Sequence, residues 1–312
     1  MKHKLRSFLL VLLVQVIAIG AFAQGVTTSS ISGKIVDEEG LPVYTATVVA
    51  VHDMTGTQYG IISSEDGFFK INNMKIGGPY TITVSYIGYK DYKMKKVFLQ
   101  LNETFDMDVQ LSKEVVEMEE FTVSANSEDE INSDRTGSIT NVNAKKIAEM
   151  PNINRSAGDL TRLTPESNGN SFGGRNNLYN NFSLDGSIFN NSFGLDYATP
   201  GGQSDAQPVS LDAIEQIQVS LAPFDVREGG FTGAGVNAVT KSGTNKVSGT
   251  AYFYLKNQAL IGNKINGSEV PNNDYNSNLF GVSVGGPIVK NKLFFFVNYE
   301  GVRRDESVSY TH

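Results

Sequence analysis

Side chains with catalytic or metal-binding chemistry are scarce in this chain. Its 312 residues include no cysteine and three histidines, His3, His52 and His312, which stand far apart in the sequence. The absence of cysteine excludes disulfides, thiolate metal sites and cysteine nucleophiles within these residues, and the histidines form no His/Glu zinc pattern. No GxSxG, P-loop or GxGxxG motif appears in the structural context that its chemistry requires. We therefore expect a protein that is not an enzyme and has no cofactor.

Carboxylates are the remaining candidates for chemistry. Asp185 and Glu215 could in principle form an acid–base pair. The acidic residues 128–134 and the Asn-Asn-Asp run at residues 272–274 offer oxygen ligands for calcium, but they lack the ordered spacing of a calcium loop. Catalysis and calcium binding are alternatives that we do not expect.

The first 23 residues have the form of an export signal. Lys2, Lys4 and Arg6 precede an apolar run over residues 8–23 that ends in Ala-Phe-Ala, so we expect cleavage before Gln24. The alternative, a membrane anchor, would require about 20 apolar residues and no cleavage site. Loss of the signal changes the net charge from −7 to −10, and a chain this acidic is not expected to bind nucleic acid.

Residues 27–112 alternate between apolar and polar side chains with a period of two. Ile31, Gly33 and Ile35 fall on one face of a strand, and residues 80–86 and 105–111 repeat the pattern. Glycine and proline mark turns at short, regular intervals. The pattern predicts a complete β-sandwich of seven strands.

Residues 113–134 are acidic, with Lys113 as their one lysine, and are typical of a linker. Within them, residues 121–125 (Phe-Thr-Val-Ser-Ala) favour a strand. A strand-prone segment in a flexible context suits docking by strand addition to a partner's sheet. The alternative is a linker with chance hydrophobic residues.

Residues 135–246 mix short helices, strands and long loops, which predicts an α+β domain. Asn143 and Ser156 are expected to cap two helices, the first stopped by Pro151. Strands are expected over residues 214–221 and 235–241. The long Asn-, Gly- and aromatic-rich stretch between residues 168 and 205 points to a functional loop.

After residue 246 the alternating runs lengthen to about ten residues, the length of a strand that crosses a membrane. Strands are expected over residues 247–257, 278–286 and 292–303, with a long connection at 258–277 and a short turn at 286–291. One face would meet lipid and the other a lumen; a further soluble β domain is the alternative. A membrane barrel needs about eight strands, so we expect the complete protein to be much longer.

Taken in order, these segments resemble the Oar-like TonB-dependent outer-membrane receptors. Residues 31–37 and 64–69 are similar to the carboxypeptidase regulatory-like, transthyretin-like domain, which is not catalytic. The segment 119–125 resembles the TonB box, which in the family pairs with the energy-transducing protein; it consists of Glu119, Glu120, Phe121, Thr122, Val123, Ser124 and Ala125. Phe121 and Ser124 depart from the usual valine- and threonine-rich version.

The most specific resemblance is to the family's plug domain, which fills the lumen of the barrel, and residues 285–296 are similar to the family's first periplasmic hairpin. The plug residues that carry the match are Gly174, Arg175, Asn176, Asn181, Asp185, Gly186, Glu215, Asn237, Thr240 and Lys241. The implied fold class is mainly β: a transthyretin-like sandwich at 27–112, a linker with TonB box at 113–134, a plug at 135–246 and the start of a transmembrane antiparallel β-barrel at 247–312.

The resemblance implies uptake of a ligand through the outer membrane of a Gram-negative bacterium, with the N-terminal domain in the periplasm. The expected partners are a TonB-type energy-transducing protein, outer-membrane lipid, an unidentified glycan, peptide or metal chelate, and a surface lipoprotein that caps the barrel. Aromatic candidates for ligand contact are Tyr179, Phe182, Phe189, Phe193 and Tyr197. Adhesion or protein secretion on the same architecture is the alternative.

Overall fold

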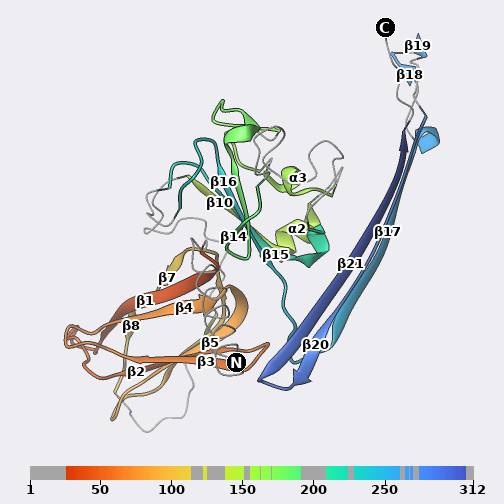
Figure 1. The fold of residues 1–312 in the computed structure, drawn as a ribbon. Helices are drawn as coiled ribbons and strands as arrows, with labels where there is room; N and C mark the ends of the chain where they lie inside the picture. The colour runs from red at the N-terminus through yellow and green to blue at the C-terminus, as the bar shows by residue number, and fades with distance from the viewer. Residues whose placement is uncertain are drawn as a thin grey trace, which may run out of the picture.

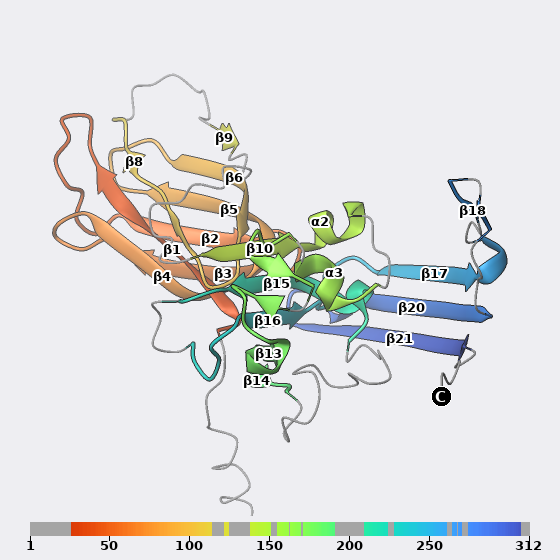
Figure 2. The same ribbon diagram turned by 90° about the horizontal axis from the view of Figure 1, so that it is seen from above.

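The computed structural model describes residues 26–113, 122–124, 138–150, 155–161, 163–169, 171–190, 209–223, 228–260, 264–266, 268–269 and 274–306. The expected export signal, most of the acidic linker and the two stretches considered for calcium lie largely or wholly outside these residues. Figures 1 and 2 show a sandwich, a small mixed α/β unit and three long strands, connected in that order.

The first unit is a sandwich of two sheets. One sheet has the order β4-β1-β7, with β8 also paired to β1, and the other has the order β3-β2-β5-β6-β9. The strands are β1 (Thr28–Val36), β2 (Thr47–His52), β3 (Thr57–Ile62), β4 (Phe68–Lys75), β5 (Gly77–Ser85), β6 (Tyr92–Leu99), β7 (Thr104–Asp106), β8 (Val109–Gln110) and β9 (Thr122–Ser124).

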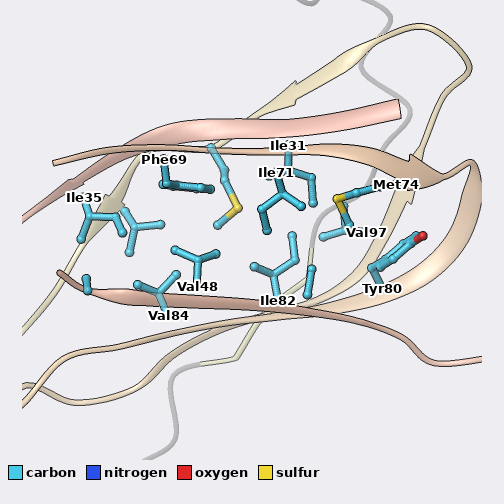
Figure 3. Packing of buried hydrophobic residues seen from close by; sticks show 14 of the residues in the cluster. Ile31, Ile35, Val48, Phe69, Ile71, Met74, Tyr80, Ile82, Val84 and Val97 are labelled. Atoms are coloured by element: carbon cyan, nitrogen blue, oxygen red, sulfur yellow. The ribbon is translucent and has the colours of Figure 1, made fainter. Parts of the chain in front are cut away.

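The period-two pattern of this unit places its apolar side chains between the sheets. Ile31 and Ile35 from β1 face Val48 and Ile82 from the opposite sheet, and all four are fully buried (Figure 3). Tyr80 closes one end of the core, where its hydroxyl donates to the Lys75 carbonyl at 2.7 Å. The expected sandwich is confirmed, with eight strands between residues 28 and 110 where the sequence predicted seven.

The second unit has a five-stranded sheet in the order β10-β15-β16-β13-β14 and a core of its own. Its elements are β10 (Ile139–Asn143), α2 (Ala144–Glu149), α3 (Ala157–Thr161), β11 (Ser167–Asn168), β12 (Ser171–Phe172), η1 (Asn177–Tyr179), β13 (Asn181–Leu184), β14 (Ser187–Ile188), η3 (Leu211–Ala213), β15 (Ile214–Ser220) and β16 (Gly235–Thr240). Both expected caps are confirmed: the Asn143 side chain accepts from Lys146 N at 2.9 Å, and the Ser156 hydroxyl accepts from Asp159 N at 3.2 Å.

The third unit is an antiparallel sheet of three long strands, β17 (Ser248–Asn257), β20 (Tyr275–Val289) and β21 (Leu293–Glu306). Between β17 and β20 lie η4 (Gln258–Leu260), β18 (Lys264–Ile265) and β19 (Ser268–Glu269). Among the described residues, no helix is both long and apolar enough to cross a membrane.

The short turn expected at residues 286–291 is wrong in its bounds. β20 continues through Pro287, which pairs with Phe294, and the ladder shifts by a bulge before Val289. A bulge accommodates a proline that has no N–H to give to the ladder. The turn itself occupies residues 290–292, where Asn291 adopts a left-handed φ of 62°, a conformation that asparagine tolerates.

Candidate functional site

The structure describes three of the seven candidate TonB-box residues. Thr122, Val123 and Ser124 form β9, which pairs in parallel with β6 of the sandwich. Residues 119–121 and Ala125 lie outside the described residues. The strand tendency predicted for this segment is therefore present, and the sheet that it joins belongs to the same chain.

Asp185 and Gly186 form the two-residue turn of the β13–β14 hairpin. Both have positive φ, 47° and 80°, which the favoured hairpin turns require and which Asp-Gly supplies. The Asp185 carboxylate accepts from Thr240 N at 2.9 Å and from the Thr240 hydroxyl at 2.8 Å. Asp185 thus fastens the hairpin to the end of β16, and in this position it acts as a hydrogen-bond acceptor.

Asparagine amides hold the loops around this hairpin. Asn176 caps η1 by accepting from Leu178 N at 2.9 Å, and Gly174 before it adopts a φ of 74°. Asn190 accepts from Phe182 N at 2.7 Å and donates to the Asn181 side chain at 2.8 Å. Asn190 follows the Asp-Gly turn, which brings it back beside β13.

Strand β15 connects the second unit to the sandwich. Gln216 accepts from Leu101 N at 3.1 Å, and Gln218 donates to Leu101 O at 2.7 Å. All three residues are almost fully buried. The two amides therefore satisfy both backbone groups of one sandwich residue. Polar residues in a strand usually face solvent, so the sequence pattern alone does not predict this contact.

Further polar contacts surround this one. Asn141 on β10 donates to Glu103 Oε1 at 2.8 Å, Asn102 donates to Glu228 Oε1 at 2.7 Å, and Asn237 on β16 donates to Val26 O at 2.5 Å. The sandwich is thus held to three separate segments of the second unit. Asn237, one of the predicted motif residues, lies in this interface.

Glu215 lies among cations at the same interface. Burial raises the pKa of Glu215, while the neighbouring Lys241 and Lys75 oppose that shift. Burial also lowers the pKa of Lys75, which donates to the Ser242 hydroxyl. Lys241 lies 3.9 Å from the Asp212 carboxylate. These charges join the sandwich to the segment that leads from β16 into β17.

The second unit also packs on one face of the long strands. The Arg155 guanidinium lies 4.6 and 4.5 Å from the ring centroids of Tyr252 and Tyr254, and it donates to the Tyr254 hydroxyl at 2.8 Å. Gly281, the register partner of Tyr252, has no side chain and leaves room for the Tyr252 ring. The guanidinium is held by two cation–π contacts and a hydrogen bond.

A hydroxyl and carboxylate cluster strengthens the same contact. Tyr252 donates to Glu300 Oε2 at 2.5 Å, and the Ser210 hydroxyl lies 3.0 Å from that oxygen and 2.8 Å from the Tyr252 hydroxyl. Thr250 donates to Asp212 Oδ2 at 2.6 Å. Ser210 is the N-cap residue of η3 and Asp212 lies within it. One short helical turn is therefore fixed to β17 and β21, the two outer strands of the sheet.

All three units meet at a single point. Asn245, in the connection between β16 and β17, donates through its backbone N–H to Met54 O of the sandwich at 2.9 Å. Its side chain also forms two hydrogen bonds with Asn291 in the β20–β21 turn, at 2.7 and 2.8 Å. The sandwich therefore lies at the end of the long strands where β20 turns into β21 (Figure 1).

The aromatic candidates for ligand contact have different positions. Tyr179 and Phe189 are 57% and 40% exposed and remain available. Phe182 is 5% exposed and belongs to the core of the second unit, so its assignment as a ligand contact is corrected. Phe193 and Tyr197 lie outside the described residues. The described residues contain no group of three or more His, Asp or Glu that could hold a metal ion.

The comparisons with known proteins identify the class of each end of the chain. Residues 239–312 match the family model of an outer membrane beta barrel domain, and residues 30–112 match that of a carboxypeptidase regulatory-like domain. The described structure is mainly β, as expected. The long strands lie within the first match, and the second covers the sandwich except for β9 and the first two residues of β1. From here on, the first and third units are called the regulatory-like domain and the barrel strands, and the middle unit is called the plug after the domain whose motifs it resembles.

One relative resembles the chain across all three units. The TonB-dependent transporter Oar of Myxococcus xanthus is 25% identical over 297 residues, which cover 89% of this chain and 27% of the relative. The resemblance to Oar-like TonB-dependent receptors is thus confirmed, and the chain spans about a quarter of that relative's length.

Solved receptors resemble the chain over about half of its length. The siderophore receptor PirA from Acinetobacter baumannii is 20% identical, with a TM-score of 0.39 over 54% of this chain and 24% of its own. The outer membrane transporter YddB from Escherichia coli is 16% identical, with a TM-score of 0.40 over 54% of this chain and 26% of its own.

Proposed function

We propose that this chain is part of an outer-membrane receptor that moves a ligand across the outer membrane with energy delivered through residues 119–125. The proposal rests on the difference between the two faces of the barrel strands. The face with Tyr252, Gly281 and Glu300 packs against the plug. The opposite face exposes a band of apolar side chains made of Ala251, Phe253, Phe280, Val282, Val284, Val297 and Tyr299.

This division suits a barrel whose outside meets lipid and whose lumen is filled by a domain. Lipid-facing and lumen-facing residues alternate along such strands, and a barrel of the wide, 22-stranded class holds a plug. The plug's polar contacts with Tyr252 and Glu300 support a position inside such a lumen. Outer-membrane lipid is accordingly one proposed partner.

We propose that the regulatory-like domain lies in the periplasm. Short turns of such barrels face the periplasm and long loops face outward. The β20–β21 turn is short, and the regulatory-like domain contacts it through Met54 and Asn245. An energy-transducing protein of the inner membrane would reach residues 119–125 from that side. A surface lipoprotein and a glycan, peptide or chelate as ligand complete the proposal, with Tyr179 and Phe189 as exposed contact candidates.

We propose that neither the carboxylates Asp185 and Glu215 nor the serines of two GxSxG sequences have a catalytic role. Asp185 accepts two hydrogen bonds from Thr240, and Glu215 interacts electrostatically with Lys241 and Lys75. The letters GxSxG occur at residues 169–173 and 281–285, but Ser171 lies in a two-residue strand and Ser283 in the middle of β20. A nucleophilic serine of that motif needs a sharp strand-to-helix turn, which neither position offers.

Deletion of residues 119–125 from the complete protein tests the proposal, with deletion of residues 128–134 as a control of equal length in the same linker. Outer-membrane fractions establish that all three proteins are inserted. Growth is then compared on purified peptides, on glycans and on chelated iron as limiting nutrients. We expect the first deletion alone to abolish growth on one of these substrates, which names the ligand class. Equal growth of all three strains on every substrate would refute energised uptake and favour adhesion.

A further inference from the structure

The edge of the regulatory-like domain carries a strand that comes from the linker. Thr122, Val123 and Ser124 pair in parallel with Lys93, Met94 and Lys95, respectively. On its other side β6 pairs with β5. Without β9, the backbone groups of β6 would form an open sheet edge, which proteins normally cover or protect.

The charges along β6 explain which strand suits this edge. Lys90, Lys93, Lys95 and Lys96 lie on or just before the strand, and the segment opposite is preceded in sequence by Glu119 and Glu120. Lysine at a sheet edge discourages pairing with chance strands. A strand with acidic residues next to it is attracted by the same lysines. The lysines along β6 therefore favour pairing with a strand that has acidic residues next to it, as the linker does.

The outer side of β9 has no partner strand among the described residues. β9 stands last in the order β3-β2-β5-β6-β9, and among the described strands only β6 pairs with it. Backbone N–H and C=O groups alternate between the two sides of a strand, so pairing on one side leaves the other free for a further strand. A segment held in this way is extended.

We propose that the β6 edge of the regulatory-like domain is the docking site for the TonB box of the same chain. The identification of the docked segment as a TonB box rests on the proposed function; the docking itself rests on the strand register. The domain holds the segment in an extended conformation at the surface, where a partner's strand can reach it, and keeps it from pairing elsewhere.

Engineered cysteine pairs test the docking directly, because residues 1–312 contain no cysteine. Adjacent strands lie about 4.8 Å apart, within the Cα separation that a disulfide accepts. Met94 packs against the sandwich core, so Lys95 points to the opposite face, and its register partner is Ser124. The test pair is Lys95→Cys with Ser124→Cys in the complete protein, oxidised in isolated outer membranes.

Two control pairs separate docking from chance encounter. Lys95→Cys with Val123→Cys shifts the register by one residue, which places the two side chains on opposite faces. Gln58→Cys with Ser124→Cys uses an exposed residue of β3 at the far edge of the sheet. We expect the test pair to form its disulfide at least tenfold faster than either control, as measured by mass spectrometry of the linked peptides.

Equal rates for the three pairs would show a freely moving linker and overturn the proposal, as would failure of the test pair to oxidise. The measurement needs no energy-transducing protein and no substrate. If the test pair forms no disulfide while growth still depends on residues 119–125, the docking alone is refuted. A fast disulfide in a protein whose growth does not depend on residues 119–125 refutes the proposed function alone.

Discussion

At the scale of single residues, His52 is a buried histidine of the regulatory-like domain, a residue type whose ordinary pKa lies near neutral pH. It is 3% exposed, its Nδ1 lies 2.8 Å from the Thr55 hydroxyl, and its ring meets Tyr80 edge to face at 4.8 Å. Burial lowers the pKa of His52 to about 4, and Lys75 adds to this effect while Asp53 opposes it. The domain therefore holds His52 neutral throughout the physiological range.

The stability of the regulatory-like domain should depend on pH through His52. Its pKa is lower in the folded state than in the unfolded state, so its stabilising contribution is complete above about pH 6.5 and is lost as the pH falls towards 4. The loss should approach about 3 kcal/mol. Urea unfolding of residues 26–112 with and without His52→Gln should show a stability difference that shrinks between pH 7 and 4. A difference that stays constant with pH would contradict this prediction.

At the scale of elements, β15 has two different faces. Ile217 and Val219 belong to the plug core, whereas Gln216 and Gln218 bind the backbone of Leu101 in the regulatory-like domain. A buried backbone group that loses its partner costs about 1–3 kcal/mol. The element thus supports the plug from one side and fixes the position of the neighbouring domain from the other.

Hydrogen exchange can distinguish the two amides. Gln216→Leu removes the acceptor of the Leu101 N–H, whereas Gln218→Leu removes the donor to its carbonyl and leaves the N–H bonded. We expect at least tenfold faster exchange of the Leu101 amide in the first variant and a much smaller change in the second, which serves as the matched control. Equal acceleration in both would mean that the interface opens as a whole.

The sequence predicted the elements better than it predicted their contacts. The helix caps at Asn143 and Ser156 and the alternation along β17 depend on neighbouring residues, so local patterns were sufficient. The pairing of β9 with β6 and the burial of Gln216 join segments far apart in sequence, which no periodicity records. Phe182 was misassigned because the stretch between residues 168 and 205 was predicted to be a loop. Residues 181–184 instead form β13, in which Phe182 and Ser183 are both buried.

At the scale of the whole molecule, the contact of Asn245 with Met54 and Asn291 determines which parts share one end of the barrel strands. The regulatory-like domain and the β20–β21 turn lie at one end, and β18 and β19 lie at the other (Figure 1). The two ends would face opposite sides of a membrane. Membrane topology is therefore a property that the structure predicts without reference to a ligand.

Labelling of single cysteines with a membrane-impermeant maleimide should report this topology. Glu65→Cys, Lys290→Cys and Lys264→Cys each replace an exposed residue. In intact cells we expect only Lys264→Cys to be labelled; after the outer membrane is made permeable, all three should react. Labelling of Glu65→Cys in intact cells would place the regulatory-like domain outside and refute the periplasmic assignment.

The connection between plug and barrel also sets a limit on how far the plug can travel. β16 ends at Thr240 and β17 begins at Ser248, and eight residue steps of extended chain reach about 28 Å at most. β10 lies at the edge of the sheet and pairs with β15, and under the proposed function a force applied through β9 would enter the plug there, at the end of the sheet opposite Thr240. If the proposed function holds, the plug is tethered at the end of β16 and pulled at the start of β10, so that β10 would separate from the sheet before β16 does.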